Sequence, residues 1–323
     1  LARSRGLGDV YKRQAKNCGF SVTKAKALKL EASGREYYRI NLTPNETKVL
    51  CYLNPKNGDH ENFLHVSNFF FKEKIKSPKI FYFNNNKGIT IQEDLGDKCL
   101  IDLDLSSNSK KIIKKSLTLL AKIQKANIPQ IPILKSDDLI VQMHKFNEEF
   151  LNNFLGVLPH NDIDKLQNEA VKELAKQPWM NCHCDFERRN LIKHDDAIAV
   201  IDFQDLSRGP IGIDLAGLII DHYVKYSDNM ISSCLDHYCY LMKFELNSKE
   251  IFEWVRWGAI QRNMRILGTL SSLYISKNRS FRLKDLPMIL NNLIDLIPKK
   301  YVSLKNHFCS DVQSQLLNKL NQI

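Results

Sequence analysis

The chain has 323 residues, 43% of them hydrophobic, which is enough for two lobes that each bury a core of their own. It contains no run of about 20 apolar residues that could span a bilayer, and its first 25 residues lack the apolar block of a secretory signal. These features argue against a membrane partner. They predict a cytoplasmic protein whose eight cysteines stay reduced.

The formal charge of +11 comes from 47 lysines and arginines against 36 acidic residues. A basic protein can bind nucleic acid, but we find no basic strip interleaved with aromatic residues, so we predict no nucleic-acid partner. Many lysines lie instead in helix-like surface runs such as residues 110–125. A lysine-rich surface attracts small anionic molecules over long range, and these are the ligands we expect.

The N-terminal part of the chain, residues 16–95, has the pattern of a small β-rich lobe. Two β-rich segments, 36–42 and 47–53, are separated by a polar turn that contains Pro44, which is a hairpin signal. Further elements are expected in this order: a helix over 61–74 and a second strand pair over 79–83 and 89–92. Ahead of this lobe, we expect residues 1–15 to be a disordered or non-native leader.

Residues 96–323 form mainly helical patterns. From Ser109 onward, apolar residues recur at three- and four-residue steps with lysines opposite, until Pro129 and Pro132 end the helix. Later helices are predicted over residues 139–154, 162–176, 213–225, 229–244, 249–276 and 285–297. The expected fold class is therefore α+β, with a β-rich lobe followed by a larger helical lobe.

One segment between those helices has residue types that suit phosphoryl transfer. His183, Asp185 and Asn190 have the spacing His-x-Asp-x4-Asn, and an apolar strand then ends at Asp202 and Phe203. Kinase-like phosphotransferases arrange their catalytic loop and metal-binding strand in this way. The reaction needs a carboxylate beside the attacking hydroxyl, and amide and carboxylate oxygens that hold Mg²⁺ against the phosphates of ATP. We therefore assign Asp185 as the catalytic base and Asn190 and Asp202 as Mg²⁺ ligands, whereas His183 is expected to brace the loop.

Longer strings around this motif resemble the aminoglycoside phosphotransferase superfamily, which has the protein-kinase-like fold. Within it, residues 202–205 (Asp-Phe-Gln-Asp) and 209–215 (Gly-Pro-Ile-Gly-Ile-Asp-Leu) resemble the anomeric kinases that phosphorylate N-acetylmuramate and N-acetylglucosamine at C1 in cell-wall recycling. Segments 33–40, 92–97, 261–268 and 284–287 agree, so the resemblance covers about residues 16 to 297. It implies a bilobal fold: a nucleotide-binding lobe over 16–95, a hinge at 92–97, and a catalytic and substrate-binding lobe over 96–323.

The nucleotide contacts follow from this resemblance and from the positions of charged residues. Ser33-Gly34 resembles a reduced phosphate-covering loop. The strand lysine that kinases place on the phosphates is missing from its usual string; Lys48 is the candidate replacement, with Arg35 and Arg39 as competing sources of positive charge. Backbone groups of the hinge would meet the adenine edge. The predicted nucleotide-binding residues are Ser33, Gly34, Arg35, Lys48, Glu93, Asp94 and Leu95.

The residues predicted to contact the acceptor sugar follow from the same resemblance. One of Arg188 and Arg189 is expected near the γ-phosphate or a lactyl carboxylate, where an arginine can bind bidentately, and Arg188 is the residue assigned to substrate binding. Gln204 and Asp205 would reach sugar hydroxyls or the acetamide, and Arg262 would line the sugar pocket. Asp214, next to Gly209-Pro210, opens a helix-like run and is expected to act as a cap and to anchor the loop.

Two residues depart from the family pattern, namely Cys184, where the family usually has Arg, and Glu187, where it has a small residue or His. Glu187 is expected to add negative charge beside a site for a polyanion. The sequence thus predicts an ATP- and Mg²⁺-dependent kinase for the C1 hydroxyl of N-acetyl sugars. One alternative is the same fold acting on an aminoglycoside, choline or another small alcohol. The charge of +11 argues against this alternative, whereas the acidic residues Glu187 and Asp205 keep it open. The other is an inactive nucleotide-binding pseudokinase, suggested by the missing lysine and Cys184, against which the intact Asp185, Asn190 and Asp202 weigh.

Overall fold

The computed structural model describes residues 19–28, 34–103 and 109–323, so the predicted leader and Ser33 lie outside the described residues. The chain divides into two compact units. We call N-lobe the unit made of the chain up to Asp102 together with Ala126–Pro129 and Asn190–Leu206. The C-lobe comprises Leu103–Lys125, Gln130–Arg189 and Ser207–Ile323. The division differs from the predicted single boundary after residue 95, because the segment that carries Asn190 and Asp202 belongs to the N-lobe.

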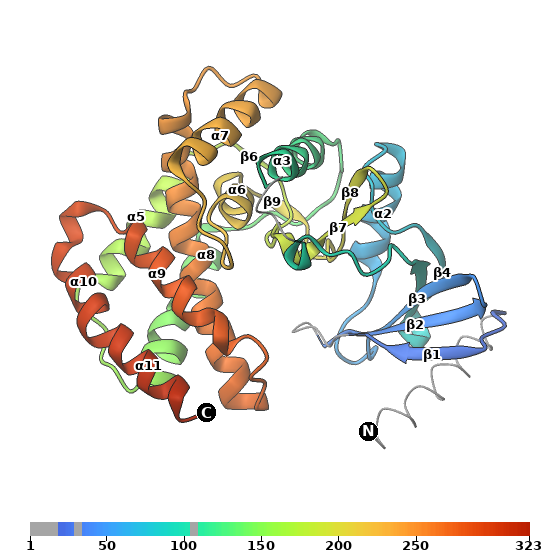
Figure 1. Cartoon of the computed structure of the whole chain (residues 1–323), viewed down its shortest axis with the longest axis horizontal. Helices are drawn as coiled ribbons and strands as arrows, with labels where there is room; N and C mark the ends of the chain where they lie inside the picture. The colour runs from blue at the N-terminus through green and yellow to red at the C-terminus, as the bar shows by residue number, and fades with distance from the viewer. Residues whose placement is uncertain (1–18, 29–33, 104–108) are drawn as a thin grey trace. The chain divides into compact units, whose positions relative to one another are not determined.

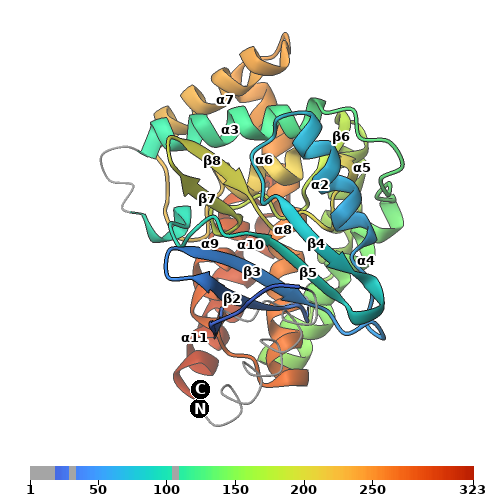
Figure 2. The ribbon, with the colours of Figure 1, turned by 90° about the vertical axis from the view of Figure 1, so that its right-hand side faces the viewer.

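The N-lobe is built on a five-stranded antiparallel sheet in the order β1-β2-β3-β5-β4, whose strands lie side by side in Figure 2. Both predicted hairpins are confirmed, whereas the edge strand β1 was not expected. The strands are β1 (Lys24–Ala27), β2 (Glu36–Thr43), β3 (Glu46–Tyr52), β4 (Ile80–Asn84) and β5 (Ile89–Glu93). The β4–β5 turn requires Gly88, whose φ is +61° and where a Cβ would lie 1.8 Å from the Leu53 carbonyl oxygen.

The two faces of this sheet differ in character, because neighbouring residues of a strand point to opposite faces. On one face, Leu50 of β3 packs in an apolar cluster with Ile40, Ile89 and Ile91. On the other face, Cys51 pairs in register with Tyr37 of β2 and Thr90 of β5. The second face is therefore polar, and it is the face that matters for the site.

A second element of the N-lobe is a hairpin formed by β7 (Leu191–His194) and β8 (Ala197–Val200). Its backbone is tied to the rest of the lobe because Lys193 N–H donates to the Lys98 carbonyl at 2.8 Å and Val200 N–H donates to the Lys76 carbonyl at 3.0 Å. These bonds explain why the hairpin groups with the sheet. The helix α2 (Glu61–Lys72), close to its predicted range, contributes to the core of the same lobe.

The C-lobe is mainly helical, and the long helix α8 packs against α4, α5, α6, α7 and α9 (Figure 1). Its helices are α3 (Ser109–Lys125), α4 (Ser136–Lys145), α5 (Ile163–Ala175), α6 (Gly212–Ile219), α7 (Asp228–Met242), α8 (Ser248–Lys277), α9 (Leu286–Leu296), α10 (Val302–His307) and α11 (Gln313–Asn321). The predicted helix 139–154 is found as α4 continued by a π-helical segment, Phe146–Leu155. In the described part of the chain, no helix combines the length and apolar character needed to cross a membrane.

One expectation for the C-lobe was wrong, and two of its helices were not predicted. The helix expected over 213–225 ends at Ile219, because the Asp221 carboxylate accepts the N–H groups of Tyr223 at 2.6 Å and Val224 at 3.0 Å and turns the chain. The helices α10 and α11 at the end of the chain were not expected at all. The remaining predicted helices are observed within a few residues of their expected ends.

Candidate active site

The candidate catalytic loop in the C-lobe, which contains His183, Cys184 and Asp185, follows β6 (Trp179–Cys182), and β6 pairs antiparallel with β9 (Ser207–Pro210). The carboxylate of Asp214 lies beneath the loop and accepts two backbone N–H groups, from His183 at 2.6 Å and from Cys184 at 2.9 Å. Burial raises the pKa of Asp214, and the bonds from the loop oppose that change. Asp214 therefore anchors this loop, whereas the capping role expected for it is not observed, since the N-cap of α6 is Ile211.

Cys184 within this loop has φ of +70°, in the left-handed region that costs a non-glycine residue about 1–2 kcal/mol. Backbone strain of this kind persists where surrounding contacts enforce it and often marks a functional loop. Here the enforcing contacts are the two bonds to Asp214 and the bond from the Arg265 side chain to the Cys184 carbonyl at 3.0 Å. The loop is thus held in one conformation immediately before Asp185.

Asp185 itself is partly accessible, with 35% of its side chain exposed. Its Oδ1 accepts a hydrogen bond from Nη2 of Arg262 at 2.9 Å, and Nη2 of Arg265 lies 3.8 Å from the same oxygen. Both arginines belong to α8, one helical turn apart. The predicted catalytic carboxylate therefore stands at the surface of the C-lobe with cations behind it.

Glu187 is fully buried among arginines. Burial alone would raise its pKa, but the guanidinium groups of Arg262, Arg282 and Arg189 outweigh that effect and lower the pKa of Glu187 to about 2. Their nitrogens lie 2.8, 3.6 and 3.6 Å from its carboxylate oxygens. The expectation that Glu187 adds uncompensated negative charge near the site is wrong, because these arginines neutralise it.

Two arginines predicted to contact the acceptor are buried. Arg188 is ion-paired through Nε to Asp221 at 2.9 Å, and its side chain is 3% exposed. Arg262 is 1% exposed and directs Nη2 to Asp185 and Glu187. These positions argue against direct contact of either arginine with a substrate. The more accessible basic side chains near Asp185 are Arg265, 23% exposed, which was not among the predicted site residues, and Arg189, 19% exposed, which was the alternative to Arg188.

The candidate metal ligands lie together in the N-lobe. Asn190 precedes β7 and Asp202 follows β8, and the carbonyl of Asn190 accepts the N–H of Ile201 at 3.0 Å, so both residues are at the same end of the hairpin. Asp202 has φ of +63°. Its Oδ1 accepts a hydrogen bond from the Gln204 side chain at 2.9 Å. Gln204 is buried, which fits a role in holding Asp202 better than the predicted contact with a sugar, whereas Asp205 is exposed.

Phe203 fixes the backbone beside Asp202 by packing in the core of the N-lobe. Its ring stacks on Phe63 with a centroid separation of 4.8 Å and lies 5.0 Å from the ring of Phe70, both on α2. The backbone on its other side is held because the Gln204 carbonyl accepts a hydrogen bond from the Asn62 side chain. The conformation at Asp202 is therefore determined by packing within one lobe.

An amide oxygen and a carboxylate at one end of a hairpin are donors of the type that Mg²⁺ prefers. Among the described residues, no group of three or more His, Cys, Asp or Glu side chains is arranged to hold a metal ion. Two protein ligands nevertheless suit Mg²⁺, which commonly takes one or two side chains and completes its coordination with water and phosphate oxygens. The residues present thus fit the ion that the fold implies.

The three basic residues considered as replacements for the missing strand lysine have different surroundings in the structure. Lys48 lies on the apolar-cluster face of β3, where its ammonium is 3.2 Å from Glu46 and 4.2 Å from the centre of the Phe81 ring. Arg39 is bound bidentately by Asp94, at 2.6 and 2.9 Å, and by Asp97 at 2.7 Å. Both placements argue against a role on the phosphates, including the one predicted for Lys48.

Arg35 has a different setting, on the polar face of the sheet. It follows Gly34, whose φ is +76°, and its charge and that of Asp202 both act on Tyr37 and Cys51. Burial raises the pKa of Cys51 to about 12, so this thiol is neutral and contributes no charge of its own. Arg35 and Asp202 therefore both place charge close to Tyr37 and Cys51.

The predicted hinge residues are tied into the N-lobe. Glu93 ends β5, and its N–H donates to the Lys79 carbonyl at 2.8 Å. Asp94 holds Arg39, and the carbonyl of the buried Leu95 is 3.3 Å from Nδ1 of His194. The hinge is therefore an ordered segment, and its predicted contact with adenine stays a prediction.

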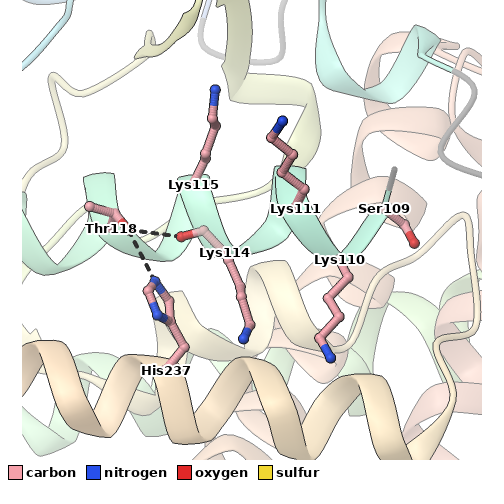
Figure 3. A pocket seen from close by; sticks show the side chains of 7 residues that line it. All are labelled: Ser109, Lys110, Lys111, Lys114, Lys115, Thr118 and His237. Atoms are coloured by element: carbon pink, nitrogen blue, oxygen red, sulfur yellow. Dashed lines mark hydrogen bonds between the residues drawn. The ribbon is translucent and has the colours of Figure 1, made fainter. Parts of the chain in front are cut away.

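A separate hollow of about 560 Å³ lies in the C-lobe between α3 and α7 (Figure 3). Lys110 and Lys114 extend toward α7, whereas Lys111 and Lys115 extend from the other side of α3 (Figure 3). Thr118 bonds to His237 at 3.2 Å across the hollow. Its lining contains no carboxylate, and it contains none of the predicted site residues.

Comparison with solved structures gives the class of the fold. Choline kinase LicA from Streptococcus pneumoniae superposes with a TM-score of 0.63 at 15% identity, covering 89% of this chain and 98% of that one. The ADP-bound aminoglycoside phosphotransferase APH(2'')-Ib superposes with a TM-score of 0.58 at 14% identity, covering 89% and 99%. The expected protein-kinase-like α+β fold is confirmed.

Comparison of sequences gives the family. Residues 31–248 match the Phosphotransferase enzyme family, APH, and the chain belongs to it. The N-acetylmuramate/N-acetylglucosamine kinase of Neisseria meningitidis is 23% identical over 303 residues, 88% of each chain. The kinase of the same name from Pseudomonas putida is 21% identical over 286 residues, 85% of this chain and 84% of that one. The protein is thus an enzyme that phosphorylates a sugar or another alcohol.

Proposed function

We propose that the protein transfers the γ-phosphoryl group of ATP to the C1 hydroxyl of N-acetylmuramate, N-acetylglucosamine or both. The observation that carries this proposal is the constrained catalytic segment: Asp185 follows a loop clamped by Asp214, and Asn190 and Asp202 meet at one end of the next hairpin. The identity of the acceptor is supported by relatives that bear these sugars in their names and match over most of their length.

In this proposal Asp185 accepts, or orients, the proton of the attacking hydroxyl. The hydroxyl of a C1 hemiacetal is more acidic than that of an ordinary alcohol, so the demand on Asp185 is modest. Asn190 and Asp202 would hold Mg²⁺, which when bound supplies positive charge against the phosphate oxygens. Use of ATP favours the cytoplasm as the place of the reaction.

On the nucleotide side, Arg35 takes the role of the missing strand lysine. It follows the turn at Gly34 and is close enough to Cys51 and Tyr37, on the face that Asp202 also reaches, to affect the pKa of both. A guanidinium is always charged and can bind two phosphate oxygens at once. Backbone groups of the hinge, residues 93–95, would contact the adenine.

The charges around Asp185 favour an acceptor that is neutral or anionic. The ion pairs there join four arginines, Arg189, Arg262, Arg265 and Arg282, to three carboxylates, Asp185, Glu187 and Asp285, which leaves one excess positive charge. An aminoglycoside or choline carries positive charge and would meet repulsion here. N-acetylmuramate carries a carboxylate, which the partly exposed Arg265 suits.

The proposal is tested by ATP turnover with a panel of acceptors, with the product identified by phosphorus NMR. The panel comprises N-acetylmuramate, N-acetylglucosamine, an aminoglycoside and choline. Formation of an anomeric phosphate on an N-acetyl sugar is the expected result. Turnover with choline or the aminoglycoside alone, or binding of Mg-ATP without transfer to any acceptor, would contradict the proposal.

A further inference from the structure

A single nitrogen of Arg262 links the catalytic loop to a buried carboxylate. Nη2 of Arg262 donates to Oδ1 of Asp185 at 2.9 Å and to Oε2 of Glu187 at 2.8 Å. The Arg262 side chain is 1% exposed and Glu187 is 3% exposed, whereas Asp185 is 35% exposed. The link therefore runs from the protein interior to Asp185, the one side chain of these three that is substantially exposed to solvent.

The interior end of this link is held in place from several sides. Arg282 and Arg189 each lie 3.6 Å from Oε1 of Glu187, on the side away from Arg262. The backbone N–H of Glu187 donates to the carbonyl of Asp185 at 3.0 Å, so the two residues share a tight turn. Glu187 is thus a fixed point against which the Arg262 guanidinium is aligned.

A neutral histidine completes the environment of Arg262. Burial, together with the nearby Arg262, lowers the pKa of His222 well below its usual value. Nη1 of Arg262 lies 3.1 Å from Nε2 and 3.4 Å from Nδ1 of this ring, and Nε2 is 2.8 Å from Oδ1 of Asn263. The guanidinium is oriented at both terminal nitrogens.

We propose that Glu187 and Arg262 are positioning residues that fix the orientation of the Asp185 carboxylate toward the acceptor hydroxyl. A partly exposed aspartate samples several rotamers, and a charge-assisted bond from an immobile donor selects one of them. Geometry matters because proton transfer requires the base within hydrogen-bond reach of the hydroxyl, and a displacement of about 1 Å can lower the rate about 10²-fold. This inference rests on the proposed function of Asp185 as the base.

The first test is Arg262→Ala with chemical rescue. We expect kcat to fall about 10²-fold while KM for ATP changes by less than about twofold, because Arg262 acts through the base and not on the nucleotide. Guanidinium ion, which fits the vacated space, should restore kcat at least about tenfold, whereas uncharged urea of the same shape should not. Loss of activity that guanidinium does not restore in folded protein would overturn the inference.

The second test uses Glu187→Gln, which keeps the side-chain shape and removes the charge. We expect a fall in kcat of roughly 3- to 10-fold, and we expect this effect to vanish in the Arg262→Ala background, because Glu187 acts only through Arg262. Effects that multiply in the double variant would refute the pairing. If Arg262→Ala does not fold, Glu187→Gln is tested alone: the fall in kcat with an unchanged KM for ATP is the expected result, and an unchanged kcat in folded Glu187→Gln would refute the proposal.

A matched control is available on the same helix. Arg256 of α8 is paired to Glu253 at 3.2 Å, one turn away, and its side chain is 31% exposed. Arg256→Ala should leave kcat unchanged with or without guanidinium, and a response equal to that of Arg262→Ala would contradict the inference.

Wild-type turnover with the N-acetyl sugars is measured first. Its absence would count against the proposed function, whereas normal wild-type turnover with an unaffected Arg262→Ala variant would count against the positioning pair alone.

Discussion

The buried Glu187 predicts a specific dependence of stability on pH. Its pKa of about 2 in the folded protein lies below the ordinary value of 4.5, because the surrounding arginines outweigh the effect of burial. A carboxylate whose folded pKa is depressed contributes stability that is complete above the unfolded pKa and is lost as the pH falls toward the folded pKa. The window for this loss therefore runs from about pH 5 down to about pH 2.

The magnitude follows from the size of the shift. A difference of about 2.5 units corresponds to about 3 kcal/mol at neutral pH, of which about 2 kcal/mol is lost by pH 3. Glu187→Gln mimics the protonated side chain at every pH. The free energy of unfolding of the wild type should therefore exceed that of Glu187→Gln by about 3 kcal/mol at pH 7, and the gap should shrink by about 2 kcal/mol at pH 3.

The assay is urea unfolding followed by circular dichroism, at several pH values between 7 and 3. Glu253→Gln is the matched control, because Glu253 is 51% exposed and pairs with Arg256 on the surface of α8. An exposed pair contributes little, so this variant should differ from the wild type by less than about 1 kcal/mol throughout. A gap for Glu187→Gln that does not change with pH would refute the reasoning.

Two further predictions concern the loop and the nucleotide. Asp214→Asn leaves one of the N–H groups of His183 and Cys184 without its acceptor. The free energy of unfolding, measured by denaturant titration, should therefore fall by about 2 kcal/mol, and kcat, measured by steady-state kinetics, should fall about 10²-fold. An unchanged kcat would show that the loop is held by other contacts. Arg35→Gln should raise KM for ATP about tenfold, whereas Lys48→Gln should change it less than twofold. A larger rise in KM for Lys48→Gln than for Arg35→Gln would show that Lys48, and not Arg35, binds the phosphates.

The catalytic segment could be predicted from sequence because its chemistry is local. Asp185, Asn190 and Asp202 follow one another within a short stretch, and their spacing alone indicates the loop and the strand that carry them. The hairpins of the N-lobe could be predicted equally well, since alternating apolar residues and polar turns define them. The anchoring role of Asp214 also followed from its place in the first turn of α6.

The surroundings of Asp185 could not be predicted in the same way. Arg262 and Arg282 come from segments far along the chain, and nothing in their local sequence indicates that they converge on Glu187. Burial of a charged group depends on partners supplied by tertiary packing, so Glu187 was interpreted as added negative charge beside the site. One signal was present, because Gln261, Arg262 and Asn263 form a polar run inside a helix that is buried along much of its length.

The placement of Lys48 could not be predicted for a related reason. Its position on β3 was clear from the sequence, but the face to which it points depends on the register of the sheet, and a shift of one residue exchanges the faces. The observed register puts Lys48 on the face of the apolar cluster and Cys51 on the opposite face.

The central claim is that Asp185 acts on the acceptor hydroxyl while the nucleotide is bound by other residues. The most direct measurement compares Asp185→Asn with the wild type, in single-turnover transfer from ATP to N-acetylmuramate or N-acetylglucosamine and in binding of Mg-ATP by calorimetry. We expect transfer to fall about 10³-fold while the affinity for the nucleotide changes less than about twofold. Transfer at the wild-type rate in this variant would contradict the account.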